Sequence, residues 1–306
     1  MEQLGVSAIH PTAPQFLSAV LLSREEIDIE RGIGRLNSLW KVGAEPAWDR
    51  TSDGSPLLHF AVAGAQVMLT QLSGSFTPKR GTLPQHSYYT AITIFIPPSR
   101  DDAPHEPDTP HPSGTHAATS THAHATENTE VVTRRRHMVT AHIVLTQLAD
   151  ALGRSSGVVG LFREELGVVQ PPQMFAQLAP LLAQGQVPLP LWVNIRAQPL
   201  AAHADRDSFD TPDKHNDVSA HDAESQLTLG RTFGLPLFGH LDLQVSESIH
   251  SPEEVYAELA NIATYLITTD SYLLPGQTLG SSEGEQIALT QALSEIDHTP
   301  VIEILY

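Results

Sequence analysis

The pattern of apolar and polar positions predicts a chain in which strands and helices mix irregularly. Short apolar runs of strand length, several of them bounded by glycine or proline, occur at residues 16–22, 57–62, 65–72, 90–96, 157–162, 189–195, 226–233, 241–246 and 301–306. Stripes of apolar residues at helical spacing occur over residues 29–40, 138–152, 172–182 and 255–266. The runs 57–62 and 65–72 flank Ala63-Gly64, which predicts a hairpin there.

This order favours an α+β fold, with a mixed or antiparallel sheet and helices packed on it, because hairpins occur beside crossovers. The first half resembles an elaborated ferredoxin-like unit, and the second half is interpreted as a diverged duplicate, although no residue-level similarity relates the two. We expect one α+β unit over residues 1–306, or two halves at 14–165 and 166–306. The strongest helix start is Ser251-Pro252-Glu253-Glu254, with serine at the N-cap and glutamate at N3.

Two segments interrupt this pattern with a different composition. Residues 101–128 contain five histidines, five acidic residues and no Lys or Arg, and residues 201–225 contain three histidines, seven acidic and two basic residues. Each segment carries a charge of -5, so together they supply -10 of the formal net charge of -18. Because both have few large apolar groups, we expect disordered loop insertions without regular structure.

The charge balance narrows the range of partners. The chain has 35 acidic against 17 basic residues, and from Thr232 onward it has eleven acidic residues and no Lys or Arg. Such a chain repels nucleic acid and anionic membrane surfaces, so we expect neither as a partner and favour a protein with a basic surface. There is no cysteine, the first residues lack the basic region typical of a signal peptide, and no apolar run approaches the roughly 20 residues that span a bilayer. These features predict a cytoplasmic protein.

Three segments, taken in order, carry a family resemblance: Val20-Leu21-Leu22-Ser23-Arg24, Pro190-Leu191-Trp192-Val193-Asn194, and Gly276-Gln277-Thr278-Leu279-Gly280 with the terminal strand. Together they resemble the bacterial family catalogued as domain of unknown function 4261. The resemblance covers most of the chain apart from the two insertions. It implies a continuous α+β unit of bacterial origin and brings no activity, cofactor or catalytic residue with it.

The histidines of the first insertion are candidate ligands for zinc or nickel. Neutral imidazole binds both ions, and nearby carboxylates can complete the coordination shell. A locally extended backbone at His122-Ala123-His124 would put both rings on one side. The same composition is also typical of a solvated linker, which is the commoner outcome. The candidate metal ligands are His111, His116, His122 and His124.

Two further patterns suggest small-molecule chemistry. An extended strand over Leu191–Arg196 would place Trp192, Asn194 and Arg196 on one face, where they could line a ligand groove; the alternative is a tryptophan packed under a helix with a solvated arginine. Residues 280–284 match the G-x-S-x-G pattern of hydrolases, and Asp297-His298 follow. A turn rather than a buried strand precedes this pattern, so Ser282 is expected to cap a helix that begins near Glu283.

The sequence therefore favours a non-enzymatic protein, without a cofactor, that binds another macromolecule through its acidic C-terminal region. Two alternatives remain open. One is a metal-binding accessory protein that acts through the histidine-rich insertions. The other is a small-molecule enzyme with its pocket beside Trp192.

Overall fold

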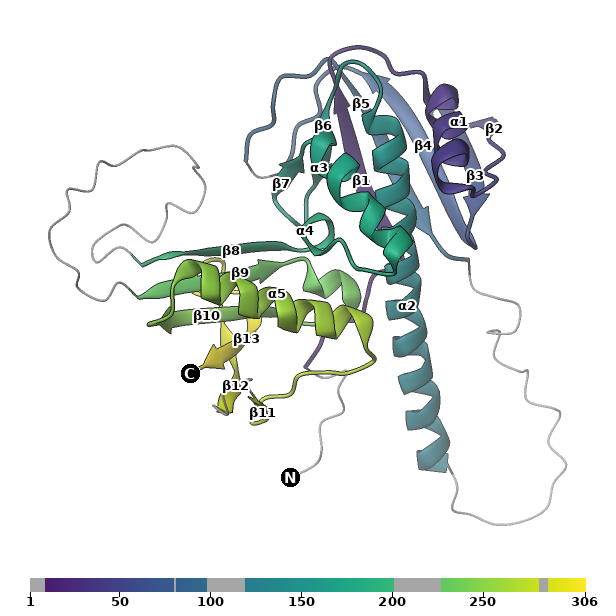
Figure 1. Cartoon of the computed structure of the whole chain (residues 1–306). Helices are drawn as coiled ribbons and strands as arrows, with labels where there is room; N and C mark the ends of the chain where they lie inside the picture. The colour runs from purple at the N-terminus through teal and green to yellow at the C-terminus, as the bar shows by residue number, and fades with distance from the viewer. Residues whose placement is uncertain (1–8, 80, 98–118, 201–226, 281–285) are drawn as a thin grey trace, which may run out of the picture. The chain divides into compact units, whose positions relative to one another are not determined.

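The computed structural model describes residues 9–79, 81–97, 119–200, 227–280 and 286–306, with side chains from residue 130 in the long helix and from residue 287 near the end (Figure 1). The chain divides into two compact units. The N-terminal unit comprises Ala13–Phe76 and Gln85–Leu161, and the C-terminal unit comprises Met1–Thr12, Thr77–Pro84 and Phe162–Tyr306. Both units combine helices with sheet, so the α+β class expected from the sequence is confirmed.

The strands of the N-terminal unit lie in the order β2-β3-β4-β5-β1-β6 in one sheet. Its elements are β1 (Phe16–Ser23), α1 (Ile29–Trp40), β2 (Ala47–Arg50), β3 (Pro56–Val62), β4 (Ala65–Ser73), β5 (Tyr88–Phe95), α2 (Thr119–Gly153) and β6 (Val158–Arg163), and β7 (Val168–Gln170) follows in the chain. The predicted hairpin at Ala63-Gly64 is confirmed between β3 and β4. Both turn residues have positive φ, 50° and 78°, which matches a two-residue turn of the type that suits twisted strands.

Helices α1 and α2 pack on each other, and α2 lies along β1, β4 and β5. The Asp28 side chain accepts a hydrogen bond from the Arg31 N–H at 2.9 Å and so caps the first turn of α1. A Cβ atom at Gly32 would come within 2.3 Å of Leu152 Cδ2, so the absence of a side chain at Gly32 allows the two helices to approach closely. The apolar stripe predicted for α2 is buried throughout; its members are Met138, Ala141, Leu145, Leu148 and Leu152.

Helix α2 starts earlier than the sequence pattern indicated. It begins at Thr119, so residues 119–128 are helical although they belong to a segment expected to lack regular structure. The last proline and glycine before the helix are Pro112 and Gly114, and without either residue after them the helix can extend backwards from its amphipathic part. Residues 101–118 and 201–225 lie outside the described residues.

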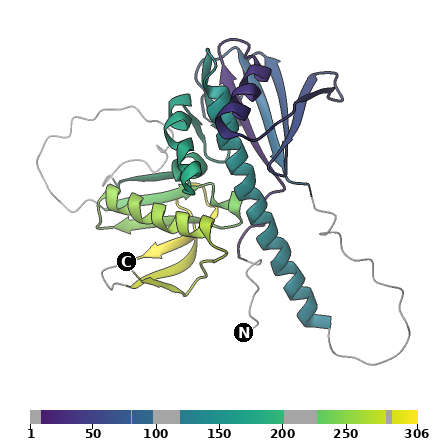
Figure 2. The same cartoon turned by 45° about the vertical axis from the view of Figure 1, so that its right-hand side comes forward.

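The C-terminal unit contains a second sheet with the order β11-β12-β13-β10-β9-β8. Its elements are α3 (Pro172–Leu178), the 3-10 helix η3 (Ala179–Gln184), α4 (Leu189–Trp192), β8 (Asn194–Pro199), β9 (Thr228–Phe233), η4 (Leu235–Phe238), β10 (Asp242–Ser248), α5 (Pro252–Thr268), β11 (Thr278–Gly280), β12 (Gln286–Leu293) and β13 (Pro300–Leu305). Helix α5 covers the face formed by β8, β9 and β10 (Figure 2). At Gly230 a Cβ atom would meet Val255 at 2.4 Å, which shows how closely α5 approaches β9.

The two units share one pattern of connectivity. In each, a central strand is followed by a helix and then by an antiparallel meander whose last strand returns to the side of the central strand. The meander β2–β5 has four strands, so β5 lies antiparallel to β1; the meander β11–β13 has three, so β13 lies parallel to β10. In the N-terminal unit α2 then leads to β6 on the other side of β1, which is a ferredoxin-like order with its hairpin extended by two strands.

Two expectations about elements are wrong, and one strand was not predicted. Residues 189–195 do not form one strand, because α4 makes a helical turn over Leu189–Trp192 before β8 begins at Asn194. No helix begins near Glu283 among the described residues from Gln286 on, which form strand β12 instead. The short edge strand β2 was not anticipated. Over the ranges that the structure describes, no helix is both long and apolar enough to span a bilayer.

Candidate functional site

The residues proposed for a ligand groove do not share a strand face. Trp192 ends the α4 turn with only 1% of its surface exposed, and it stacks on Phe238 with ring centroids 6.0 Å apart. Asn194 Nδ2 donates to the Leu166 carbonyl at 3.0 Å, and the Arg196 guanidinium lies 5.1 Å from the Phe233 ring centroid. The predicted shared face of Trp192, Asn194 and Arg196 is therefore wrong, because the first of them lies on a buried helical turn.

The predicted metal ligands fall where side chains are not described. His111 and His116 lie outside the described residues, and His122 and His124 lie in the first turns of α2. Their backbone is helical and not extended, so the geometry expected for the His122-Ala123-His124 pair is absent. Among the residues with described side chains, no group of three or more His, Asp or Glu residues is arranged to hold a metal ion.

Asp297, which follows the hydrolase-like pattern in the sequence, pairs with an arginine of the sheet. Ser282 lies outside the described residues, whereas Asp297 forms a bidentate pair with Arg231 of β9. Arg231 Nη1 and Nη2 donate to the two carboxylate oxygens at 2.7 and 3.1 Å, and Nη2 also donates to Thr299 Oγ1 at 2.8 Å. Arg231 donates to the Ser294 hydroxyl as well. The turn between β12 and β13 is thus held over the sheet by one buried arginine.

This arginine belongs to a row of polar residues that crosses the sheet. Strand registers place Arg196 opposite Arg231, Arg231 opposite Gln244, Gln244 opposite Glu303, and Glu303 opposite Thr290. Gln244 Nε2 donates to Glu303 Oε2 at 2.9 Å, and the Ser246 N–H donates to Glu303 Oε1 at 2.7 Å. Burial raises the pKa of Glu303, and this effect outweighs the hydrogen bonds from Ser246 and Gln244, which lower it.

Asp242 is the most strongly perturbed carboxyl group beside this row. Burial raises its pKa to about 7, although the Leu235 N–H, Arg231 and Thr232 act in the opposite direction. The Thr232 hydroxyl and the Leu235 N–H each donate to Asp242 Oδ1 at 3.1 Å. For Asp297 partial burial is outweighed by hydrogen bonds from Arg231 and Thr299, which hold its pKa at about 2. The two carboxyl groups near Arg231 therefore titrate far apart, and both couple proton binding to the stability of this unit.

A second buried cluster joins the residues before β1 to the sheet. The rings of His10, His240 and Tyr272 lie together, with centroids 5.1 to 5.8 Å apart. The Leu241 N–H donates to His10 Nδ1 at 3.1 Å, so the ring proton resides on Nε2, which donates to the Leu273 carbonyl at 2.7 Å. His10 thereby ties two loops of the C-terminal unit together in its neutral form.

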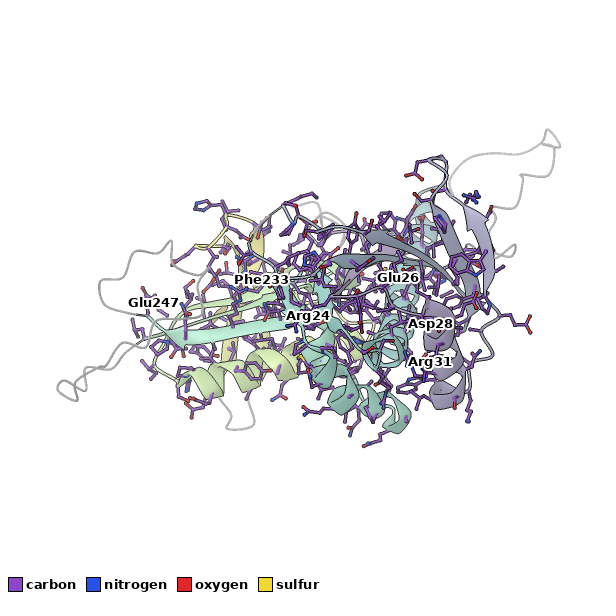
Figure 3. All side chains as sticks on the ribbon, turned by 90° about the horizontal axis from the view of Figure 1, so that it is seen from above. Arg24, Glu26, Asp28, Arg31, Phe233 and Glu247 are labelled. Atoms are coloured by element: carbon purple, nitrogen blue, oxygen red, sulfur yellow. The ribbon has the colours of Figure 1, made fainter. Side chains whose placement is uncertain are left out.

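The exposed surface with an unusual composition lies where β10 ends and α5 begins. Its members are Glu247, Ile249, Glu253, Glu254, Tyr256 and Tyr306, and we refer to them as the acidic surface. Ile249 is 80% exposed, which is high for a large apolar side chain. Glu247 lies at the opposite end of the strands from Phe233 (Figure 3). The acidic surface is therefore separated along the sheet from the end that carries Phe233.

Tyr306 connects the end of β13 to this surface. Its ring lies 4.8 Å from the His250 ring, and its hydroxyl donates to Glu258 of α5. Ser251 caps α5 through the predicted capping box, with its side chain accepting from the Glu254 N–H and its own N–H donating to Glu254 Oε2. The hydrogen bonds from the backbone and side chain of Ser251 hold the pKa of Glu254 below its usual value. Glu254 therefore favours its ionised form, and its carboxylate lies 3.9 Å from His250 Nδ1.

Comparison with protein families adds one finding. Residues 231–305 match the model of the family described as Domain of unknown function (DUF4261). The resemblance expected from the sequence is confirmed for this part of the chain, which runs from Arg231 through β13 and includes most of the acidic surface. The segments at Val20–Arg24 and Pro190–Asn194 lie outside the match. No curated protein and no solved structure matches the chain.

Proposed function

We propose that this protein binds a basic segment of another protein through the acidic surface. The observation that carries the proposal is the combination of exposed glutamates with exposed Ile249, Tyr256 and Tyr306 in a region that has no Lys or Arg after Arg231. Tyrosine and other large side chains with a polar tip are typical anchors of protein interfaces. Four carboxylates between residues 247 and 258 supply the field that attracts a cationic partner.

The geometry supports a preformed surface. Glu254 is fixed by the capping box, and Tyr306 is fixed by Glu258 and His250, so these side chains have little freedom to lose on binding. Between the glutamates lie apolar or aromatic groups that the rest of the unit leaves exposed. A partner segment with lysines or arginines around one apolar or aromatic residue would complement both features.

The test is a binding titration with a flexible peptide of lysine, glycine and serine, which carries charge without strand propensity, and with its glutamate counterpart. We expect the lysine peptide to bind, the glutamate peptide not to bind, and the affinity to fall as salt rises. Reversing two charges (Glu247→Lys with Glu253→Lys) should weaken binding by about tenfold, since each reversal removes attraction of order 0.5–1 kcal/mol at a solvated site.

The matched control reverses two exposed charges in the N-terminal unit (Glu45→Lys with Asp49→Lys), which changes the net charge equally. Thermal unfolding of both variants checks that the fold is retained. Equal binding by the two variants, or equal binding of the two peptides, would show that the acidic surface is not the binding site.

A further inference from the structure

Strand β12 has two sides, and only one is fully paired. Along Ala288–Leu293 it pairs with β13. On its other side β11 pairs with residues 286–288, and the loop that precedes β11 pairs with Leu289. The Leu289 N–H donates to the Gln277 carbonyl at 3.0 Å, and the Leu289 carbonyl accepts from the Gly276 N–H at 2.8 Å. Beyond Leu289 the covering segment ends.

The direction of the next backbone groups follows from strand geometry. Backbone N–H and C=O groups alternate between the two sides of a strand with a period of two residues. Gln291 and Leu293 therefore direct these groups to the same side as Leu289, away from β13. In the described part of the chain no residue pairs with them. Four strong hydrogen-bonding groups are thus presented on an open strand edge.

The edge of β12 lacks the features that normally protect an open sheet edge from pairing with another chain. Such edges usually contain charged residues or proline, or consist of very short strands. The N-terminal sheet ends in β2, which is four residues long and carries Asp49 and Arg50, and β8 of the second sheet ends in Pro199. Strand β12 is eight residues long, has no charge and no proline, and exposes 65% of the Leu293 side chain.

We infer that the edge of β12 at Gln291–Leu293 binds an extended segment of another protein, of alternating apolar and basic residues, as an added strand. An apolar side chain of that segment would cover Leu293, and a basic one would meet Glu295, which is exposed in the turn that follows. A second copy of this chain fits less well, because a formal net charge of -18 opposes self-association. The edge lies outside the acidic surface, so this inference does not depend on the proposed function.

The experiment titrates a fluorescent Lys-Val-Lys-Val-Lys-Val-Lys peptide into the full chain in about 0.3 M salt, where attraction between exposed charges is largely screened. A copy of the peptide with every backbone nitrogen methylated keeps the charge but cannot pair as a strand. Gln291→Pro removes an N–H that pairs with nothing in the described structure, so folding should be retained. Gln291→Thr is the matched control, because it keeps the N–H.

We expect binding by the unaltered chain and by Gln291→Thr. Binding should be at least about tenfold weaker with Gln291→Pro, which removes one of the four backbone groups and puts the proline ring on the edge, and with the methylated peptide, which has no backbone N–H to donate. Equal binding of the methylated peptide overturns the inference without any change to the protein. It is also overturned if the unaltered chain does not bind, if folded Gln291→Pro binds equally, or if sedimentation shows a dimer that Gln291→Pro abolishes. The acidic-surface variant should bind this peptide like the unaltered chain.

Discussion

Replacing Asp242 with asparagine should remove a pH dependence of stability from the C-terminal unit. Burial raises the pKa of Asp242 to about 7, whereas in the unfolded chain it titrates near about 3.9. The folded state therefore holds this proton over a range in which the unfolded state has lost it. The stabilisation is fully present below about pH 4 and is lost as the pH rises through about 7.

The size of the effect follows from the two pKa values. Each pH unit between them changes the free energy of unfolding by about 1.4 kcal/mol, so the contribution of Asp242 should fall by about 2.5 kcal/mol between pH 5 and pH 7.5. Asparagine keeps the oxygen that accepts from the Thr232 hydroxyl and the Leu235 N–H but cannot ionise. The free energy of unfolding of Asp242→Asn should therefore increase relative to that of the unaltered chain as the pH rises.

The assay is urea unfolding at pH 5, 6, 7 and 7.5, followed by fluorescence of Trp192. Changing Trp40 and Trp48 to phenylalanine leaves this buried tryptophan as the reporter of the C-terminal unit. The quantity of interest is the difference in unfolding free energy between the aspartate and asparagine forms. In the control, the difference in unfolding free energy between the unaltered chain and Glu247→Gln, a change at an exposed carboxylate, should stay constant over the same pH range. A difference that stays constant across this range, or that grows toward acid, would refute the reasoning.

Three further predictions concern packing, the buried ion pair and metal. Gly32→Ala should lower stability by about 1–3 kcal/mol through its clash with Leu152, while Gly34→Ala on the open side of α1 should raise it by about 0.5–1 kcal/mol; equal shifts in thermal unfolding would contradict the close approach of the helices. Arg231→Met should lower the free energy of unfolding in urea by about 3 kcal/mol, and adding Asp297→Asn should recover part of that loss; additive losses would argue against the bidentate pair. Calorimetric titration with zinc or nickel should show weak uptake at pH 7.5 that fades by about pH 5.5, because imidazole must be unprotonated to bind. Replacing His111, His116, His122 and His124 with alanine should remove most of the uptake, and equal uptake by this variant would contradict the prediction.

Elements with local signals could be predicted from the sequence. The apolar stripe from Ile29 gave α1 with its correct bounds, and Ala63-Gly64 gave the β3–β4 hairpin, because helix periodicity and turn chemistry act over a few residues. The capping box at Ser251 is equally local. The run 189–195 was misassigned because a short, fully apolar stretch does not distinguish a buried strand from a buried helical turn.

The candidate site is formed by contacts between residues far apart in the sequence, which no local sequence pattern indicates. Arg231 and Asp297 are 66 positions apart, and only the return of the meander to β10 brings the turn after β12 over β9. The charge of the region after Arg231 was visible in the sequence, but the sequence did not show which glutamates lie beside exposed aromatic residues. The open edge of β12 could not be anticipated either, since it arises because β11 is shorter than its neighbour.

The central claim, that the acidic surface binds a basic segment, is tested most directly by hydrogen exchange of the unaltered chain with and without the flexible lysine peptide. Amide exchange reports local opening, and a bound partner slows it where it covers the backbone. We predict slower exchange over residues 247–258, at the end of β10 and the start of α5, with the N-terminal unit unchanged. Unchanged exchange at 247–258 under saturating peptide, or protection confined to the N-terminal unit, would contradict the account.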